Sequence, residues 1–239
     1  FFVHSVRNVR DRITDEKLQA QIAAFIGQEA MHSKAHAEFN DAWRRDDYNL
    51  DSFQAWLGRR DALIKSVPPK YQLAVTAAFE HFTALLGGYI LRHPEVLSTL
   101  DDDAIKLWVW HAIEEMEHKD VAYDVMQQVA KVDYRTRAYA LALIGVMMPT
   151  FTLIRATRML TVDGSSRIER LRMLRDGLPW LFGKHGMLTP MRKPFMQWFK
   201  RDFHPNDHAV VHNYPVWLKV FNDTGDALKA GEAFWQAGH

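Results

Sequence analysis

Two segments of the sequence carry a glutamate and a histidine in the pattern Glu-x-x-His. The pairs are Glu29 with His32, and Glu115 with His118. In an α-helix, residues three apart lie about one turn from each other on the same face. Carboxylates neutralise divalent cations, and imidazole completes their coordination. With Glu80 between them, the two pairs predict a dinuclear metal site in the core of a four-helix bundle.

The predicted ligands continue the apolar stripes of their helices, so we expect them to face inward. An unpaired carboxylate in a protein core is very costly, and a bound cation would remove that cost. The three stripes are Leu18, Ile22, Phe25, Ile26, Glu29, His32, His36 and Phe39; Leu73, Ala77, Glu80, Ala84 and Gly87; and His111, Glu115, His118 and Ala122.

The elements that must position these residues are helices. Residues 1–12 have the spacing of a helix end, and Thr14 and Asp15 are N-cap candidates for the next helix. Pro68-Pro69 and His93-Pro94 are helix boundaries. We expect an all-α, ferritin-like four-helix bundle with additional C-terminal helices. The main helices are predicted over Asp15–Arg45, Leu50–Ser66, Pro69–Arg92 and Asp103–Val132.

The lengths of the predicted helical hairpins test whether the ligands can meet. In two antiparallel helices, residues equally far from the turn lie level. Glu80 lies 17 residues before a turn centred near residue 97, so its level partner is Glu114 or Glu115. The same reasoning places the partner of Glu29 a few residues before Phe1. We therefore expect an N-terminally truncated chain whose fourth carboxylate precedes Phe1.

Other polar residues lie near the predicted site. Four of them are each within one turn of a predicted ligand: His36, His111, Glu114 and His81. They are predicted to be further ligands, partners that orient a ligand, or core residues with their own partners. A second, weaker cluster is formed by His204, Asp207 and His208, with His212 one turn further on. It predicts either a second metal site, a cover over the bundle mouth, or a polar surface turn.

We divide the chain into a metal-binding helical bundle, 1–134, and an apolar helix followed by a basic, aromatic helical extension, 135–239, packed on the bundle. Residues 138–154 carry no charge, but 17 residues is the lower limit for a membrane span and Pro149 interrupts them. A fifth helix on the bundle or at a membrane surface is favoured over a true span. Arg167–Arg175 predicts a short basic helix, followed by short helices and loops.

Charge is distributed unevenly along the chain. Residues 1–130 hold 14 basic and 20 acidic side chains, and residues 131–239 hold 16 basic and 9 acidic ones. The basic half indicates either an anionic partner, such as a phospholipid surface or an acyl carrier, or a solvated surface. It contains no recognisable motif for reading bases, so no specific nucleic-acid partner is expected. The absence of cysteine excludes disulfides, thiolate catalysis and cysteine-ligated metals.

Residues 25–32 and 110–119 resemble the bacterial family labelled "predicted metal-dependent hydrolase". The ligand pattern is also similar to that of ferritin-like di-iron carboxylate proteins. The resemblance implies that Glu29 and His32 serve one metal, that Glu115 and His118 serve the other, and that Glu80 completes the cluster. It further implies a glutamate shortly ahead of Phe1-Phe2.

These residues support three hypotheses of function. The first is a di-iron enzyme that activates O2, with an electron donor, to oxidise an apolar or aromatic small molecule or a lipid. The second is a metal-dependent hydrolase of an ester or phosphoester, with manganese or zinc as alternatives to iron. The third is a non-catalytic iron-binding or membrane-associated protein. We expect a cytoplasmic location, with peripheral contact to the inner membrane through residues 138–203 and a homodimer as further expectations.

Overall fold

The computed structural model describes residues 1–42 and 50–238, and this part of the chain is helical without a strand. The all-α prediction is therefore confirmed. Short 3₁₀ turns lie at Arg10–Arg12, Pro94–Val96 and Pro205–Asp207. The helices are α1 (Phe2–Arg7), α2 (Glu16–Ala42), α3 (Leu50–Lys65), α4 (Pro69–Ile90), α5 (Asp102–Glu117), α6 (Val121–Asp124), α7 (Tyr134–Val162), α8 (Arg167–Phe182), α9 (Arg192–Gln197), α10 (Tyr214–Thr224) and α11 (Ala227–Ala237).

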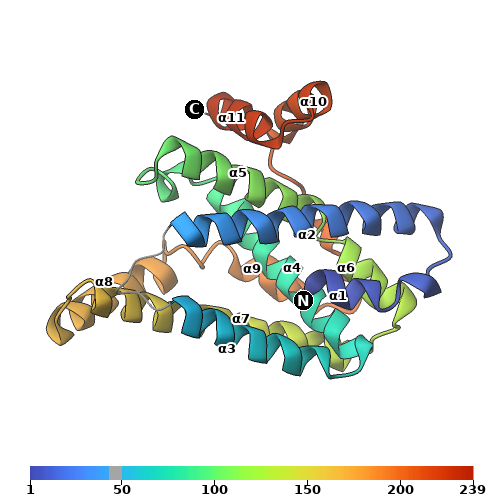
Figure 1. Ribbon diagram of the computed structural model, residues 1–239, viewed down its shortest axis with the longest axis horizontal. Coiled ribbons are helices and arrows are strands. Elements are labelled where there is room, and N and C mark those ends of the chain that lie inside the picture. Colours follow the sequence, from blue (N-terminus) through green and yellow to red (C-terminus); the bar gives the residue numbers. More distant parts are fainter. Residues whose placement is uncertain (43–49, 239) are drawn as a thin grey trace.

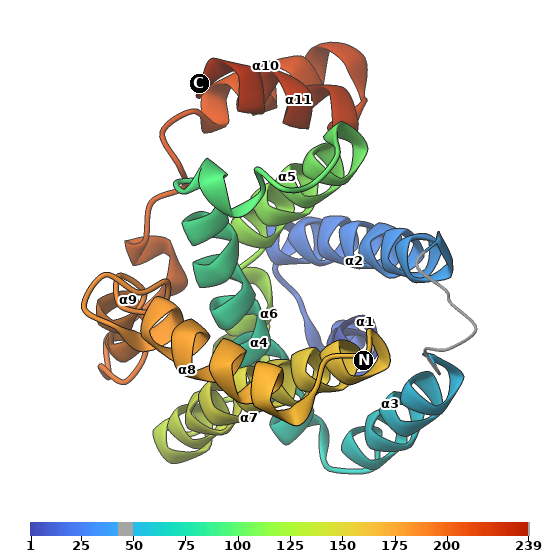
Figure 2. The same ribbon diagram turned by 90° about the vertical axis from the view of Figure 1, so that its left-hand side faces the viewer.

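Helix α4 is the central element of the molecule (Figure 2). It contacts α1, α5, α6 and α7 and, less extensively, α3 and α9. Small residues permit these contacts. A Cβ atom at Gly87 would lie 2.8 Å from the carbonyl oxygen of Ala112, so only glycine allows α5 to approach this closely. The sequence of α4 thus sets the separation of the two helices that carry Glu80 and Glu115.

The starts of α2 and α4 lie at the cap candidate and the proline predicted from the sequence. The Asp15 side chain accepts hydrogen bonds from the backbone N–H groups of Lys17 and Leu18 at 2.8 and 3.1 Å. Pro69 begins α4, and Asp101 caps α5 through the N–H of Ala104. The predicted end of the second helix at Arg45 lies outside the described residues.

The predicted continuous helix over 103–132 is wrong. Helix α5 ends at Glu117, His118 has non-helical backbone angles (φ −101°, ψ 11°), and α6 runs directly into a π-helical turn at Val125–Val129. Interactions with the C-terminal region accompany the break: Lys119 donates to the backbone carbonyl of His208, and Asp120 accepts from the amide of Asn206 at 2.6 Å. Local spacing within the helix cannot anticipate these distant partners.

Residues after 134 contribute to two hydrophobic cores. The larger core joins α1, α2, α4, α6 and α7 with Trp198 and Phe203. The smaller core joins α5 with α10 and α11 through Trp110, Trp217 and Phe234. Figure 1 shows α10 and α11 stacked over α5, on the opposite side of the molecule from α3 and α7.

The predicted apolar helix is part of α7, and the predicted basic helix extends beyond Arg175 to Phe182 as α8. Helix α7 has buried residues only between Arg137 and Ile144, and α8 has none. Within the described residues, α4 and α7 are long and apolar enough to cross a membrane. The apolar character of α4 reflects its place in the core, because 61% of its most apolar 18-residue stretch is buried. For α7 the buried share is 17%.

Candidate metal centre

The two Glu-x-x-His pairs meet in the interior of the molecule. Within the described part of the chain, Glu29, His32, Glu115 and His118 are the one group of three or more possible metal ligands whose ligand atoms all lie within 4.8 Å of one another. We call these four residues the inner group. Helix α2 supplies the first pair, and the end of α5 supplies the second. All four are buried, with exposed fractions between 2 and 7%.

The atoms that face the centre of the inner group are free to bind a cation. His32 Nδ1 lies 3.4 Å from Glu29 Oε1 and 3.4 Å from Glu115 Oε1, and His118 Nε2 lies 3.7 Å from Glu29 Oε1. Two atoms bound to one metal at about 2.1 Å in tetrahedral geometry are separated by about 3.4 Å. Among the described residues, Glu29 Oε1, His32 Nδ1 and His118 Nε2 have no hydrogen-bond partner. The donor set therefore fits a divalent metal.

The outward-facing nitrogens of both histidines are held by further carboxylates. His32 Nε2 pairs with Glu114 Oε2 at 3.0 Å, and His118 Nδ1 pairs with Glu80 Oε2 at 2.8 Å. Such partners fix the ring orientation and increase the basicity of the inward nitrogen. Glu114 thus has the orienting role that its sequence position allowed. Glu80 lies beside the inner group with Oε1 unpartnered, and its direct ligation of a metal stays a prediction.

Two residues hold the Glu115 carboxylate. His111 Nε2 lies 3.1 Å from Glu115 Oε1, and its ring stacks on His32 with 4.1 Å between centroids. The Thr83 hydroxyl donates to Glu115 Oε2. Sequence reasoning missed Thr83, although it lies one turn after Glu80 on the same helix. The contact between Thr83 and Glu115 also corrects the predicted register of the two helices. Thr83, rather than Glu80, lies level with Glu115, and Glu80 lies level with His118.

The buried charges of the metal-free cluster are balanced by protons. Burial by itself lowers the pKa of His32, but its hydrogen bond with Glu114 and the close carboxylates of Glu115 and Glu29 outweigh burial and raise the pKa to about 11. Burial likewise lowers the pKa of His118, and the adjacent Glu80 raises it to about 9. Burial raises the pKa of Glu115, but its hydrogen bond with His111 and the nearby His32 hold the pKa well below its usual range. Burial also raises the pKa of Glu80 to about 8, so protons on His32 and on the His118–Glu80 pair balance the buried carboxylates.

A cavity of about 320 Å³ opens onto the inner group. Its lining includes Phe1, Phe2, Ser33 and His36, together with residues of the cluster. His36 does not join the inner group, and its ring packs against His111 at 4.8 Å. Burial and the nearby His111 and His32 lower the pKa of His36, so this imidazole is neutral. A neutral imidazole has one ring nitrogen that can accept a hydrogen bond or a proton.

An apolar cavity of about 300 Å³ adjoins the first one, because Phe1 and Phe2 line both. Its other walls are formed mainly by α3, α4 and α7, with Trp56, Phe79 and Phe151 among them. Phe1 and Phe2 therefore separate a polar metal-facing space from an apolar space.

The other predicted residues lie elsewhere. His81 packs against Trp198 and Phe203, away from the inner group, because successive residues of α4 differ by about 100° in direction. The weaker cluster does not surround one point: His204 pairs with Asp124 at 3.0 Å, His208 with Gln197, and Asp207 accepts from the backbone N–H of His204. A second metal site there stays a prediction, and these contacts explain the residues as loop-ordering groups.

Residues 1–209 match the family model described as "Predicted metal-dependent hydrolase". The match includes every residue of the inner group and confirms the resemblance of the two sequence blocks. No curated protein and no solved structure matches the chain. The family and the buried carboxylate–histidine group together support a metal-dependent protein.

Proposed function

Because this chain belongs to the family of predicted metal-dependent hydrolases, we propose that it is a metal enzyme, and that its centre holds two iron ions that activate O2. The substrate is a small apolar or aromatic molecule that is oxidised. The observation that carries this proposal is the inner group itself: two carboxylates and two imidazoles meet in a helical core, and inward atoms of Glu29, His32 and His118 lack hydrogen-bond partners. Bound iron supplies the one-electron chemistry that O2 requires.

The protein residues keep this centre rigid. Glu114 and Glu80 fix the two histidine rings, and His111 and Thr83 fix the Glu115 carboxylate. All of these partners lie on α4 or α5, and Gly87 sets the separation of those helices. A preorganised site of this kind changes little when a metal enters.

The cavities support an apolar substrate. The apolar space beside Phe1 and Phe2 can hold a hydrocarbon or aromatic body, and the adjoining cavity leads to Glu115 and His111. A bound apolar molecule would displace water from these aromatic walls, which favours its oxidation over loss of reactive species to solvent.

Metal-dependent hydrolysis of an ester or phosphoester is the second candidate, and a specific observation favours it besides the family description. The neutral His36 imidazole lies in the metal-facing cavity without belonging to the inner group. It could accept a proton from an attacking water, as a general base does. The same metal centre would then polarise the bond that is cleaved.

The test is to purify the protein under nitrogen, measure its metal content, and record the absorption spectrum before and after adding air. Two irons per chain and a new oxygen-dependent band are the expected result. Two redox-inert metals without a spectral change would overturn oxygen activation. In that case, ester hydrolysis that falls in His36→Ala but not in His185→Ala would support the second candidate, because His185 is exposed and lines neither cavity.

A further inference from the structure

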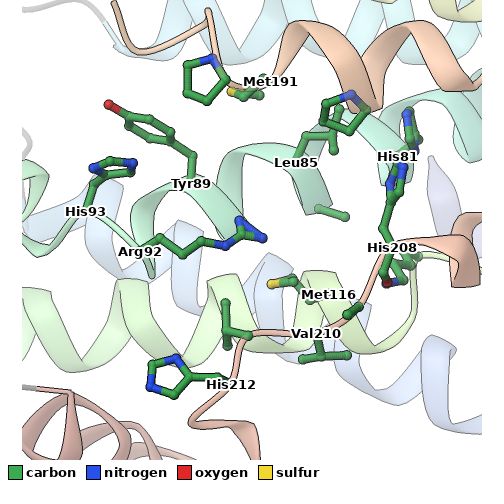
Figure 3. A pocket seen from close by; sticks show the side chains of 16 residues that line it. His81, Leu85, Tyr89, Arg92, His93, Met116, Met191, His208, Val210 and His212 are labelled. Carbon is green, nitrogen blue, oxygen red and sulfur yellow. The ribbon is translucent and has the colours of Figure 1, made fainter. Parts of the chain in front are cut away.

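A larger cavity, of about 560 Å³, lies on the other side of α4 and α5 from the inner group. Its walls come from α4, the end of α5, and the segments 190–194 and 208–212 (Figure 3). None of the inner-group residues lines it. It is therefore a separate site, and the proposed metal chemistry does not account for it.

The charged residues that line this cavity are cationic. Arg92 and Lys119 are its charged residues, four histidines accompany them, and no described lining residue is an aspartate or glutamate. The charges of Arg92 and Lys119 repel each other. Asp120 offsets part of the Lys119 charge, but it lies outside the lining and accepts from Asn206. The cavity thus concentrates a positive potential.

The side chain of Arg92 is oriented by α4. Its Nη1 donates to the backbone carbonyl of Gly88 at 2.7 Å. A Cβ atom at Gly88 would lie 3.1 Å from Arg92 Nη2, so glycine gives the guanidinium room to lie along the helix. Figure 3 shows the guanidinium pointing into the cavity. No ion pair forms between Arg92 and a described carboxylate, so its charge remains available to a ligand.

His81 lies across the cavity from Arg92 (Figure 3). Its side chain is 1% exposed, and its Nε2 has no hydrogen-bond partner among the described residues. Unpartnered buried polar atoms are rare in proteins and often mark a missing ligand or water. This atom is a second, independent sign that something polar binds here.

The remaining walls are apolar. They include Leu85, Met116, Met191 and Val210. Inorganic phosphate would leave these surfaces exposed to water, whereas a ligand with a hydrocarbon or aromatic body would cover them. Methionine side chains also adapt to ligands of irregular shape.

We propose that this cavity binds an amphiphilic anion, with its carboxylate or phosphate head on Arg92 and Lys119 and its apolar body against Leu85, Met116 and Met191. Arg92 provides planar donors for either head group. The buried Lys119 adds a second positive charge, and its ammonium also donates to the backbone of His208.

Isothermal titration calorimetry of the metal-loaded protein with decanoate, decyl phosphate, decanol and inorganic phosphate tests this proposal. At least one alkyl anion should bind about tenfold or more tightly than decanol, and Arg92→Gln should weaken it by a similar factor. The preferred anion identifies the head group. Arg59→Gln, an exposed arginine on α3, is the matched control and should leave binding unchanged.

Three outcomes would overturn the proposal. If decanol binds as tightly as the anions, the positive charges do not contribute to binding. If inorganic phosphate binds as tightly as decyl phosphate, the apolar walls do not contribute. Unchanged binding in Arg92→Gln would place the anion elsewhere, including at the metal centre. Leu85→Trp, which fills the cavity without altering a charge, should abolish binding and provides a second check.

A different observation supports a second inference, which concerns the surface formed by residues 145–182. We call these residues the α7–α8 hairpin. None of them is buried, although apolar side chains are frequent. Figure 1 shows α8 projecting from one end of the molecule. The large exposed apolar side chains include Val146, Ile154, Ile168, Leu171, Leu178 and Trp180.

The hairpin is also cationic. It contains six arginines and neither lysine nor histidine, and its acidic residues are Asp163, Glu169 and Asp176. Arginine beside exposed leucine and tryptophan is typical of helices that lie at the surface of an anionic membrane. A second copy of the chain would carry the same excess of positive charge on its own hairpin, which disfavours self-association through this face.

We infer that the α7–α8 hairpin docks on an anionic phospholipid surface. Co-sedimentation with vesicles of phosphatidylcholine mixed with phosphatidylglycerol should recover the protein, and vesicles of phosphatidylcholine alone should recover much less. Leu171→Glu should release it from the mixed vesicles. Leu63→Glu is the matched control, because Leu63 on α3 is 68% exposed and Leu171 is 66% exposed.

Two results would overturn this inference. One is equal recovery of Leu171→Glu and Leu63→Glu with the mixed vesicles; the other is no recovery of the unmodified protein with vesicles of either composition. A dimer in sedimentation velocity that Leu171→Glu dissociates would also overturn it, because the hairpin would then contact a second copy of the chain. The binding of decyl phosphate in the larger cavity is measured without vesicles, so the two inferences fail or succeed separately.

Discussion

Helix α4 separates two polar regions of opposite charge. On one side, Glu80 and the inner group concentrate buried carboxylates; on the other side, Arg92 and Lys119 line a cavity without a described carboxylate. Neighbouring residues serve opposite sides: Glu80 pairs with His118, whereas His81 lines the cationic cavity. Because an α-helix turns about 100° per residue, two adjacent residues of one helix can face two different electrostatic environments.

The two regions also differ in how their charge is balanced. In the metal centre, histidine protons neutralise the carboxylates, so the metal-free cluster can exist in the core. In the cavity, no comparable group neutralises Arg92 among the described residues, and this side chain remains largely exposed. The comparison shows that a buried charge cluster is self-balanced, whereas a charge at a cavity mouth can rely on solvent until a ligand arrives.

The largest expected effect separates the two regions directly. Glu115→Ala removes the carboxylate that contacts His32, His111 and Thr83, so we expect metal content to fall below about one tenth of the wild-type value. Arg92→Gln should leave metal content unchanged. Inductively coupled plasma mass spectrometry of the purified proteins measures both, and equal metal loss in the two variants would show that the regions are not independent.

Changing the pH should affect the metal centre next most strongly. A metal-bound imidazole is neutral, and the pKa values of His32 and His118 in the metal-free cluster are about 11 and about 9. Metal must displace these protons, so its affinity should rise about tenfold or more per pH unit between about pH 6 and 8. Competition with a chelator at each pH measures this slope, and a flat profile would contradict the proton-balanced cluster.

The same groups determine how stability depends on pH without metal. Their folded-state pKa values lie above the unfolded value of about 6.5, so protonation favours the folded state. This stabilisation is complete below about pH 6.5 and is lost as the pH rises through about 9 and then about 11. Thermal unfolding of the metal-free protein should therefore occur at lower temperature at pH 9.5 than at pH 7.

An intermediate effect is expected when a ring-orienting carboxylate is changed. Glu114→Gln keeps the size of the side chain that contacts His32 Nε2 but removes its charge. Metal affinity should fall about 10- to 100-fold, as is usual for partners of metal-bound histidines. The matched variant Glu38→Gln changes an exposed residue of α2 and should have no effect. If the metal affinity of Glu114→Gln is unchanged, Glu114 does not orient His32.

The smallest effects distinguish two adjacent glycines of α4. In Gly87→Ala the new Cβ meets the Ala112 backbone at 2.8 Å, so the protein should lose about 1–3 kcal/mol of stability. In Gly88→Ala the Cβ meets the flexible end of Arg92 at 3.1 Å, so stability should change less and anion binding in the cavity should weaken. Chemical denaturation and calorimetry compare the pair, and equal destabilisation would contradict the assigned contacts.

The sequence by itself determined the features that depend on local spacing. Capping at Asp15, the start of α4 at Pro69 and the inward stripes of α2 and α4 are all present in the structure. Glu-x-x-His spacing also places each glutamate and histidine on one helix face. These properties follow from helix geometry and from the backbone groups that helix ends leave unpaired, and both act within a few residues.

Only the tertiary structure decided which faces meet. The register that pairs Thr83 with Glu115, the break at His118 and the outward direction of His81 all depend on contacts between segments far apart in the sequence. The cationic cavity depends on them as well, since Lys119 and His208 are joined across 89 positions. Such contacts are set by helix separation and by shared packing in the core, which no local pattern encodes.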